Sequence, residues 1–87
     1  MSFRVQEIQE TPNPNARKFL LDRPIVDHPT SFFNAAAAKG NGLAERLFAI
    51  PGVCSLLLLN DFITINKAPE ARWQAITPVV KDVLAQD

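Results

Sequence analysis

The sequence has few of the side chains that hold metals or form crosslinks. Its 87 residues include one cysteine, Cys54, and one histidine, His28. Structural zinc or an iron–sulfur cluster takes about four thiolate or imidazole ligands, and this chain supplies two at most. A single cysteine also excludes an internal disulfide, which fits a reducing compartment. We therefore predict no metal site and no cofactor on this chain.

Catalytic groupings are missing as well. Only three glycines are present, and none lies in the spacing of a phosphate-binding loop. Cys54 begins an apolar stretch and His28 lies in a proline-rich segment, which favours an inert small side chain and a solvated loop residue. No acidic pair stands close enough in sequence to suggest acid–base chemistry. We predict that the chain is not an enzyme, because it lacks a nucleophile with a matching base.

No long run of one charge or of apolar residues occurs. Nine basic residues balance nine acidic ones, whereas nucleic-acid binding requires a basic surface. No stretch approaches the roughly 20 apolar residues of a membrane span, and the N-terminus lacks the apolar run of a signal peptide. We expect one domain over residues 1–87, a cytoplasmic location, and no nucleic-acid or membrane partner. We expect a monomer or a weak homodimer.

The first third of the chain predicts a β-hairpin with a stiff connection. Residues 3–8 begin with apolar alternation, and residues 17–22 resume a strand pattern. Residues 11–16 (TPNPNA) lie between them, and their prolines and asparagines favour a turn. Residues 23–33 are broken by prolines and are hard to interpret, although a third short strand within them is plausible.

The middle of the chain predicts a helical segment and then a second hairpin. Asn34 can cap the alanine turn that follows it, and Gly40 can end that turn. Leucine and phenylalanine at helical spacing continue to Ile50, where Pro51-Gly52 stops the helix. Residues 53–59 and 62–67 are strongly strand-like, and the two residues between them are a candidate tight turn.

A final helix is predicted from Pro69, which suits a first helical turn. Its apolar stripe consists of Trp73, Ile76, Val80, Val83 and Leu84. Pro78 removes one helical hydrogen bond, so we expect a kink or break near Thr77. The predicted fold is α+β and two-layered, with a mostly antiparallel sheet of about four strands and two helices on one face, in the order β-β-α-β-β-α.

The register of the second hairpin assigns its side chains to two faces. With Asn60 and Asp61 in the turn, one face carries Cys54, Leu56, Leu58, Ile63 and Ile65, and it is the better core. The other face is mixed but includes Leu57, Leu59, Phe62 and Thr64. Helices on one face leave the other open, and its apolar patch then suggests an association surface. Alternatively, residues 23–33 fold over this patch.

Three cations follow the turn at residues 11–16. Arg17, Lys18 and Arg23 lie near Asn13 and Asn15 in sequence, and together they could receive an anion or an acidic partner segment. The alternative is that these charges are simply solvated on an exposed hairpin.

Two stretches of the sequence, residues 11–24 and 43–69, carry a resemblance to a known family. The matching residues are Thr11, Pro12, Asn13, Pro14, Asn15, Lys18, Phe19, Leu43, Ala44, Leu47, Phe48, Pro51, Gly52, Val53, Asp61, Phe62, Ile63, Thr64 and Lys67. The chain resembles the N-terminal domain of Nfu/NifU-type iron–sulfur cluster scaffold proteins. Longer family members carry a separate C-terminal domain whose Cys-x-x-Cys pair holds the cluster, and no such pair occurs here.

The resemblance implies an accessory or interaction module in iron–sulfur cluster assembly or delivery. Such a module acts by protein–protein contact without holding a cluster, so iron–sulfur chemistry enters only through its partners, which are assembly or recipient proteins. The alternative is a peptide- or anion-binding domain of the same fold outside that pathway. The predicted partner-binding residues are Asn13, Asn15, Arg17, Lys18, Leu57, Leu59, Phe62 and Thr64.

Overall fold

A five-stranded antiparallel sheet forms one layer of the computed structural model, which describes residues 3–86. The strands are β1 (Val5–Glu10), β2 (Ala16–Leu21), β3 (Thr30–Phe32), β4 (Val53–Leu59) and β5 (Phe62–Lys67). Their order in the sheet is β1-β2-β5-β4-β3, and each neighbouring pair is antiparallel. The pairing of β2 with β5 thus joins the two hairpins, β1–β2 and β4–β5, in one sheet.

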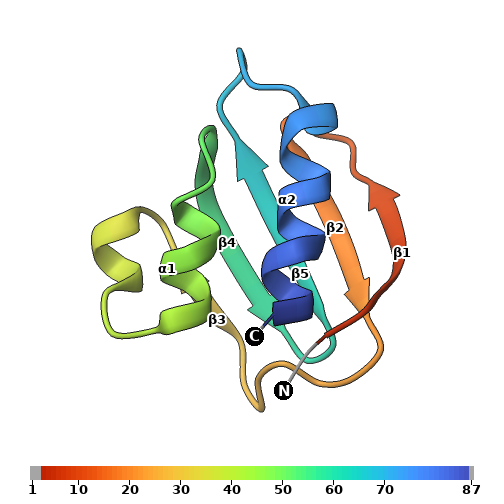
Figure 1. Cartoon of the computed structure of the whole chain (residues 1–87), viewed down its shortest axis with the longest axis vertical. Helices are drawn as coiled ribbons and strands as arrows, with labels where there is room; N and C mark the ends of the chain where they lie inside the picture. The colour runs from red at the N-terminus through yellow and green to blue at the C-terminus, as the bar shows by residue number, and fades with distance from the viewer. Residues whose placement is uncertain (1–2, 87) are drawn as a thin grey trace.

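Two helices form the second layer. They are α1 (Gly42–Phe48) and α2 (Trp73–Gln86), with a short 3₁₀ helix, η1 (Ala35–Ala38), before α1. Figure 1 shows α1 and α2 lying across the same face of the sheet. The predicted α+β fold with both helices on one face is confirmed. The fifth strand is β3, which forms inside the segment where a short third strand was plausible.

The β4–β5 hairpin follows the predicted register. Leu56 pairs with Ile65, Leu58 with Ile63, and Leu59 with Phe62. Asn60 has a φ of 53°, in the left-handed region that asparagine tolerates better than most residues. That conformation closes the two-residue turn and fixes the pairing, so the prediction for this hairpin is confirmed.

The core lies between the sheet and the two helices. Phe19, Ile63 and Ile65 are fully buried on the sheet side, while helical residues at spacings of three and four face them. The buried residues of the two main helices are Leu43, Ala44, Leu47, Ile76, Val80 and Leu84. No polar or charged side chain is buried among the described residues, so this interior is held by apolar packing.

Cys54 does not follow the alternation predicted for its strand. Val53 pairs with Lys67 and Ser55 with Asn66, so two steps along β4 match one step along β5. This β-bulge leaves Cys54 without a partner and turns its side chain outward. Val53 packs against the core instead, and Cys54 is exposed. The prediction that Cys54 shares the buried face with Leu56 is therefore wrong.

The final helix begins later than predicted. Pro69 lies in a turn in which the Ala71 N–H donates to the Ala68 carbonyl at 3.0 Å. The first i→i−4 bond of α2 runs from the Ile76 N–H to the Arg72 carbonyl at 3.2 Å, so the helix starts at Trp73.

The helix also continues through Pro78, so of the predicted kink or break the break is absent. Pro78 and Gln74, whose carbonyl loses its partner, are both exposed, and water can satisfy that carbonyl. Buried Ile76 and Val80 anchor the helix on either side of the proline. Packing of the apolar stripe of α2 offsets the loss of this one backbone hydrogen bond.

Side-chain caps set the helical segment between the hairpins. The Asn34 side chain accepts from the Ala37 N–H at 2.9 Å, which confirms the predicted cap. The Asn41 side chain accepts from the Ala44 N–H at 3.0 Å and caps α1 in the same way. The helix then ends at Phe48, ahead of Pro51.

We expect Gly52→Ala to destabilise the protein more than Gly40→Ala. Both glycines have positive φ, +96° and +95°, so each alanine costs about 1 kcal/mol in backbone strain. At Gly52 a new Cβ would also lie 2.6 Å from the Ala71 Cβ, whereas nothing lies within 4 Å at Gly40. Urea unfolding of the two variants measures the difference; equal losses of unfolding free energy would contradict the close contact.

Candidate functional site

The turn at residues 11–15 is held in one shape by its own side chains. The Thr11 hydroxyl lies 2.9 Å from the Asn13 carbonyl oxygen and 3.1 Å from that of Ala16, and it accepts from the Asn13 N–H at 3.2 Å. The Asn13 side chain accepts from the Asn15 N–H at 2.9 Å, which is an Asx turn. With φ already fixed at two prolines, these bonds leave the turn little freedom.

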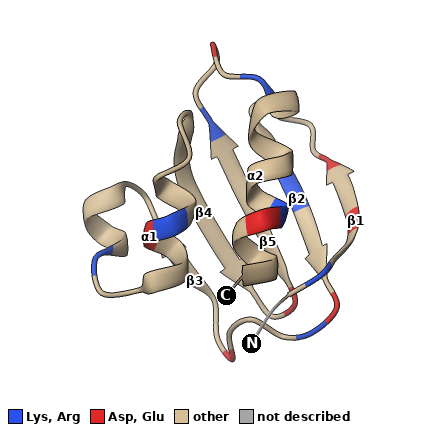
Figure 2. Ribbon diagram, viewed as in Figure 1, with Lys and Arg blue, Asp and Glu red and all other residues tan. Residues whose placement is uncertain are grey.

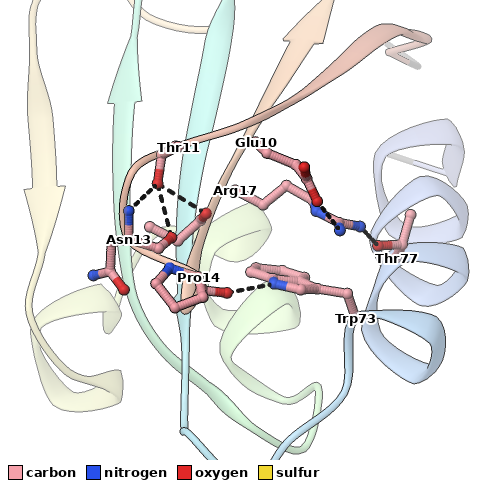
Figure 3. Close-up of polar contacts among 8 residues, drawn as sticks. Glu10, Thr11, Asn13, Pro14, Arg17, Trp73 and Thr77 are labelled. Carbon is pink, nitrogen blue, oxygen red and sulfur yellow. Dashed lines mark hydrogen bonds and ion pairs between the residues drawn. The ribbon is translucent and has the colours of Figure 1, made fainter.

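Trp73 connects this turn to the core. Its indole N–H donates to the Pro14 carbonyl at 3.1 Å, and its ring lies 6.2 Å from that of buried Phe19 at a tilted angle. Trp73 is the first residue of α2. The start of the helix and the turn therefore hold each other in place, as Figure 3 shows for the indole and the Pro14 carbonyl.

Arg17 lies against the same indole. Its guanidinium carbon is 4.9 Å from the centre of the Trp73 ring, within cation–π distance. One guanidinium nitrogen is 3.4 Å from the Thr77 hydroxyl oxygen, and the other is 3.6 Å from a Glu10 carboxylate oxygen (Figure 3). Arg17 thus sits on the helix side of the sheet, between β1 and α2.

Asn15 is tied to the end of β5. Its backbone carbonyl accepts from the Lys67 N–H at 2.8 Å, and its side chain accepts from the Lys67 ammonium at 3.0 Å. The same ammonium is 5.9 Å from the centre of the Trp73 ring. A second cation therefore lies close to the tryptophan.

The three cations named from the sequence do not gather. Successive residues of a strand point to opposite faces, so Arg17 and Lys18 are separated by the sheet. The Lys18 ammonium lies 4.1 Å from the centre of the Phe62 ring on the face away from the helices. Arg23 follows the far end of β2, where it is 3.2 Å from the Asp22 carboxylate. Of the two possibilities raised by the sequence, a joint site made by all three cations is therefore not formed.

The face away from the helices has an apolar centre. Leu57, Leu59 and Phe62 are each half-buried there, beside half-buried Thr64. Leu20 pairs with Phe62 and adds a fourth large apolar side chain, which the sequence analysis did not include. We call the set of Lys18, Leu20, Leu57, Leu59, Phe62 and Thr64 the open face.

Residues 23–33 run along the border of the open face. Strand β3 extends the sheet at its edge by pairing with β4. Ile25 and Val26 donate backbone hydrogen bonds to the Asn60 carbonyl and pack against the core cluster. This placement favours the prediction of an open apolar patch over the alternative in which the segment folds across it.

The possible metal ligands are separated. Cys54 lies at the start of β4, and His28 precedes β3, whose first residue pairs with Leu58 near the other end of β4. His28 is an exposed loop residue, as predicted, with its ring 2.6 Å from the Asp27 carboxylate. Within residues 3–86 no three Cys, His, Asp or Glu side chains lie together as a metal site. Cys54 and His28 of one chain therefore do not come together as ligands of one metal centre.

Charged residues are scattered over the molecule. Figure 2 shows basic and acidic positions interspersed along the strands, helices and loops of residues 3–86, with no single basic stripe among these residues. None of the helices in the described part of the chain is long and apolar enough to cross a membrane.

The chain matches a family of known proteins over almost its whole length. Residues 5–87 match the family described as the scaffold protein Nfu/NifU N terminal. A human relative, named NFU1 iron-sulfur cluster scaffold homolog, mitochondrial, is 40% identical over 74 residues, which cover 83% of this chain. NifU-like protein 4, mitochondrial, of Arabidopsis thaliana is 29% identical over 75 residues, or 85% of this chain. The match covers 29% of the human protein and 26% of the plant one.

Solved structures share the fold. The solution structure of a NifU-like protein from Saccharomyces cerevisiae has a TM-score of 0.81 and 30% identity, covering 95% of this chain and 77% of that one. The crystal structure of protein SAV1430 from Staphylococcus aureus has a TM-score of 0.77 and 25% identity, covering 92% of this chain and 96% of that one.

Several residues of these surfaces carry little signal of a binding role in the sequence. Trp73 was assigned to the apolar stripe of its helix, and Trp73, Glu10 and Thr77 were given no binding role. Their proximity to Arg17 joins residues that are about 60 positions apart, as the Arg17–Thr77 contact shows. The indole nitrogen was the one available signal, because a partly buried tryptophan N–H needs an acceptor.

The contacts of Asp22 predict that the folded protein loses stability as the pH falls into the acid range. Its carboxylate accepts from the Arg4 N–H at 3.0 Å and lies beside Arg23, and these contacts lower its pKa. Because the folded pKa lies below the unfolded one, this stabilisation is present above the unfolded pKa and is lost as pH falls through the folded pKa. Asp22→Asn keeps an acceptor but does not titrate. Thermal melts from neutral to acid pH should show a shallower acid decline for Asp22→Asn, and parallel declines would contradict the assignment.

Proposed function

The chain belongs to the family of Nfu/NifU scaffold N-terminal domains, and from this premise we propose that it is an interaction module in iron–sulfur cluster assembly or delivery. It works by protein–protein contact and holds no cluster itself. The cluster is the cargo of its partners, which are assembly proteins or recipient proteins. The chain is not an enzyme in this proposal.

The small number of possible cluster ligands supports a role in protein contacts rather than in cluster binding. The human relative is named as an iron–sulfur cluster scaffold homolog, whereas this chain spans under a third of that protein's length. One cysteine and one histidine are far short of the four ligands of a cluster. The exposed Cys54 lies at the start of β4, whereas His28 precedes β3, whose first residue pairs near the other end of β4, so the two side chains are separated within the chain.

The open face is the observation that carries the proposal. It combines an apolar centre with a single cation, Lys18, whose ammonium rests on the Phe62 ring. Interfaces commonly have an apolar centre and a polar rim, and here Ser55, Thr64 and Asn66 supply polar groups on the same side of the sheet. The turn at residues 11–15 precedes β2 and is held on the helix side by Trp73 and Lys67, so Asn13 and Asn15 form a second, separate part of the proposed contact surface.

The location of this protein in the cell stays a prediction. The cytoplasmic location was expected from the residues alone, and both the human and the plant relatives carry the word mitochondrial in their names.

A charge reversal on the open face tests the contact. We expect Lys18→Glu to reduce the recovery of iron–sulfur assembly or recipient proteins when the tagged chain is used as bait in a native lysate. Lys81→Glu is the matched control, because Lys81 is exposed on α2, on the other side of the sheet. Recovery is quantified by mass spectrometry after thermal melts confirm that both variants fold.

Two outcomes of this experiment count against the proposal. One is that the unaltered chain captures no iron–sulfur assembly or recipient protein. The other is that both charge reversals reduce capture equally, since a general effect of charge would then explain the loss.

Anaerobic reconstitution tests the claim that the chain holds no cluster. With iron and sulfide supplied in excess, we expect no stable visible absorbance from a cluster after desalting, because one thiolate cannot complete the coordination. Cys54→Ser is the control and should give the same spectrum. A stable band that is lost in Cys54→Ser would overturn this part of the proposal.

A further inference from the structure

Arg17 is held as a rigid, partly exposed fork at the junction of the turn, β2 and α2. The Trp73 ring supports its guanidinium, whose carbon lies 4.9 Å from the ring centre, and the Trp73–Pro14 hydrogen bond holds the indole in turn. The Arg17 side chain keeps 22% of its surface exposed. A guanidinium of fixed orientation loses little entropy when it binds a ligand, so it is suited to bidentate recognition.

The intramolecular contacts of Arg17 leave binding capacity unused. An arginine carries five N–H donors, and Arg17 has polar contacts at 3.4 Å to Thr77 and at 3.6 Å to Glu10. Charge-assisted hydrogen bonds are usually about 2.7–2.9 Å long. Both contacts are therefore weak, and a better-placed acceptor would replace them with little loss.

Space for an acceptor lies on both sides of the guanidinium. A hollow of about 200 Å³ is lined by Glu10, Arg17, Trp73 and the turn at residues 11–16. A second hollow of about 440 Å³ is lined by Arg17, Trp73, Gln74, Thr77 and Pro78. The two hollows share Arg17 and Trp73, so a chain segment laid across this corner passes over the fork.

The charges around Trp73 favour a negatively charged ligand at this site. Arg17 and Lys67 both lie close to Trp73, whereas the carboxylate in contact is that of Glu10, whose side chain is 85% exposed. Glu10 itself shows that a carboxylate can reach the outer guanidinium nitrogen. An exposed ion pair of this kind contributes little free energy, so Glu10 is a weak internal competitor for the position.

We propose that Arg17, stacked on Trp73, binds an Asp or Glu carboxylate from an acidic segment of a partner protein, and that Glu10 occupies this position in the free protein. The site lies on the helix side of the sheet and is separate from the open face. It rests on the proposed function only for the identity of the partner, because binding of an acidic peptide is a property of the isolated chain.

Titration with a short blocked peptide tests this site. The probe is acetyl-Ala-Glu-Ala-Glu-Ala-amide, and its control is the same peptide with glutamine in place of glutamate. Binding is followed by NMR through the Trp73 indole N–H and the Arg17 side-chain N–H signals. We expect saturable shifts of both signals with the glutamate peptide and none with the glutamine peptide.

Substitution of the internal competitor separates binding from general electrostatics. Glu10→Gln should tighten binding about two- to five-fold, because the competing ion pair is removed. Glu7→Gln is the matched control: it lies on the same strand, makes the same change in charge, and pairs with Leu20 on the open-face side. It should leave the affinity unchanged. Arg17→Lys should weaken binding about tenfold, because lysine lacks the planar fork.

Each result of these titrations either supports or overturns the proposed carboxylate site. Tighter binding in Glu10→Gln but not in Glu7→Gln supports the proposal, whatever the lysate capture shows. Equal tightening in both variants, shifts caused equally by the glutamine peptide, or binding of inorganic phosphate without binding of the glutamate peptide would each overturn it. If Arg17→Lys fails to fold, the comparison of the two glutamate variants still decides.

Discussion

Burial of one face of the β4–β5 hairpin beneath two helices is the constraint on which the structure depends. Leu56, Leu58, Ile63 and Ile65 are almost fully buried, and each such side chain contributes about 2 kcal/mol of hydrophobic free energy. Because strand residues alternate between faces, burying this set necessarily turns Leu57, Leu59 and Phe62 to the other side. The outward direction of these side chains is therefore a consequence of burying the core. The open face is apolar because leucine and phenylalanine occupy these outward positions.

Trp73 transmits the order of the core to the surface. Its ring touches Phe19 on one side and Arg17 on another, and its indole N–H holds the turn through Pro14. The turn, the first residue of α2 and the start of β2 thus form one rigid corner. A rigid corner suits recognition, because groups that are already ordered lose less entropy on binding. The proposed carboxylate site uses this property directly.

The two proposed contact surfaces lie on opposite sides of the sheet and have different chemistry. The open face offers apolar area with one lysine, and the corner offers a fixed guanidinium beside hollows. A partner that engages both would have to wrap around the edge at β1 and the turn. Neither surface includes Cys54, which the β-bulge at the start of β4 exposes elsewhere. This separation agrees with a module that makes contacts while other proteins supply the thiols.

The sequence by itself determined what depends on neighbours along the chain. Alternation at residues 56–65 set the hairpin register, Asn34 set a cap, and prolines and asparagines set the turn at residues 11–15, because these signals depend only on residues nearby in the sequence. The shortage of metal ligands also follows from the residues alone. Tertiary structure decided what depends on packing between distant segments: the bulge that exposes Cys54, the continuation of α2 through Pro78, and the placement of Arg17 against Trp73. The corner of Arg17, Trp73 and Thr77 belongs to the same class, because burial of the apolar stripe of α2 brings residues about 60 positions apart into contact.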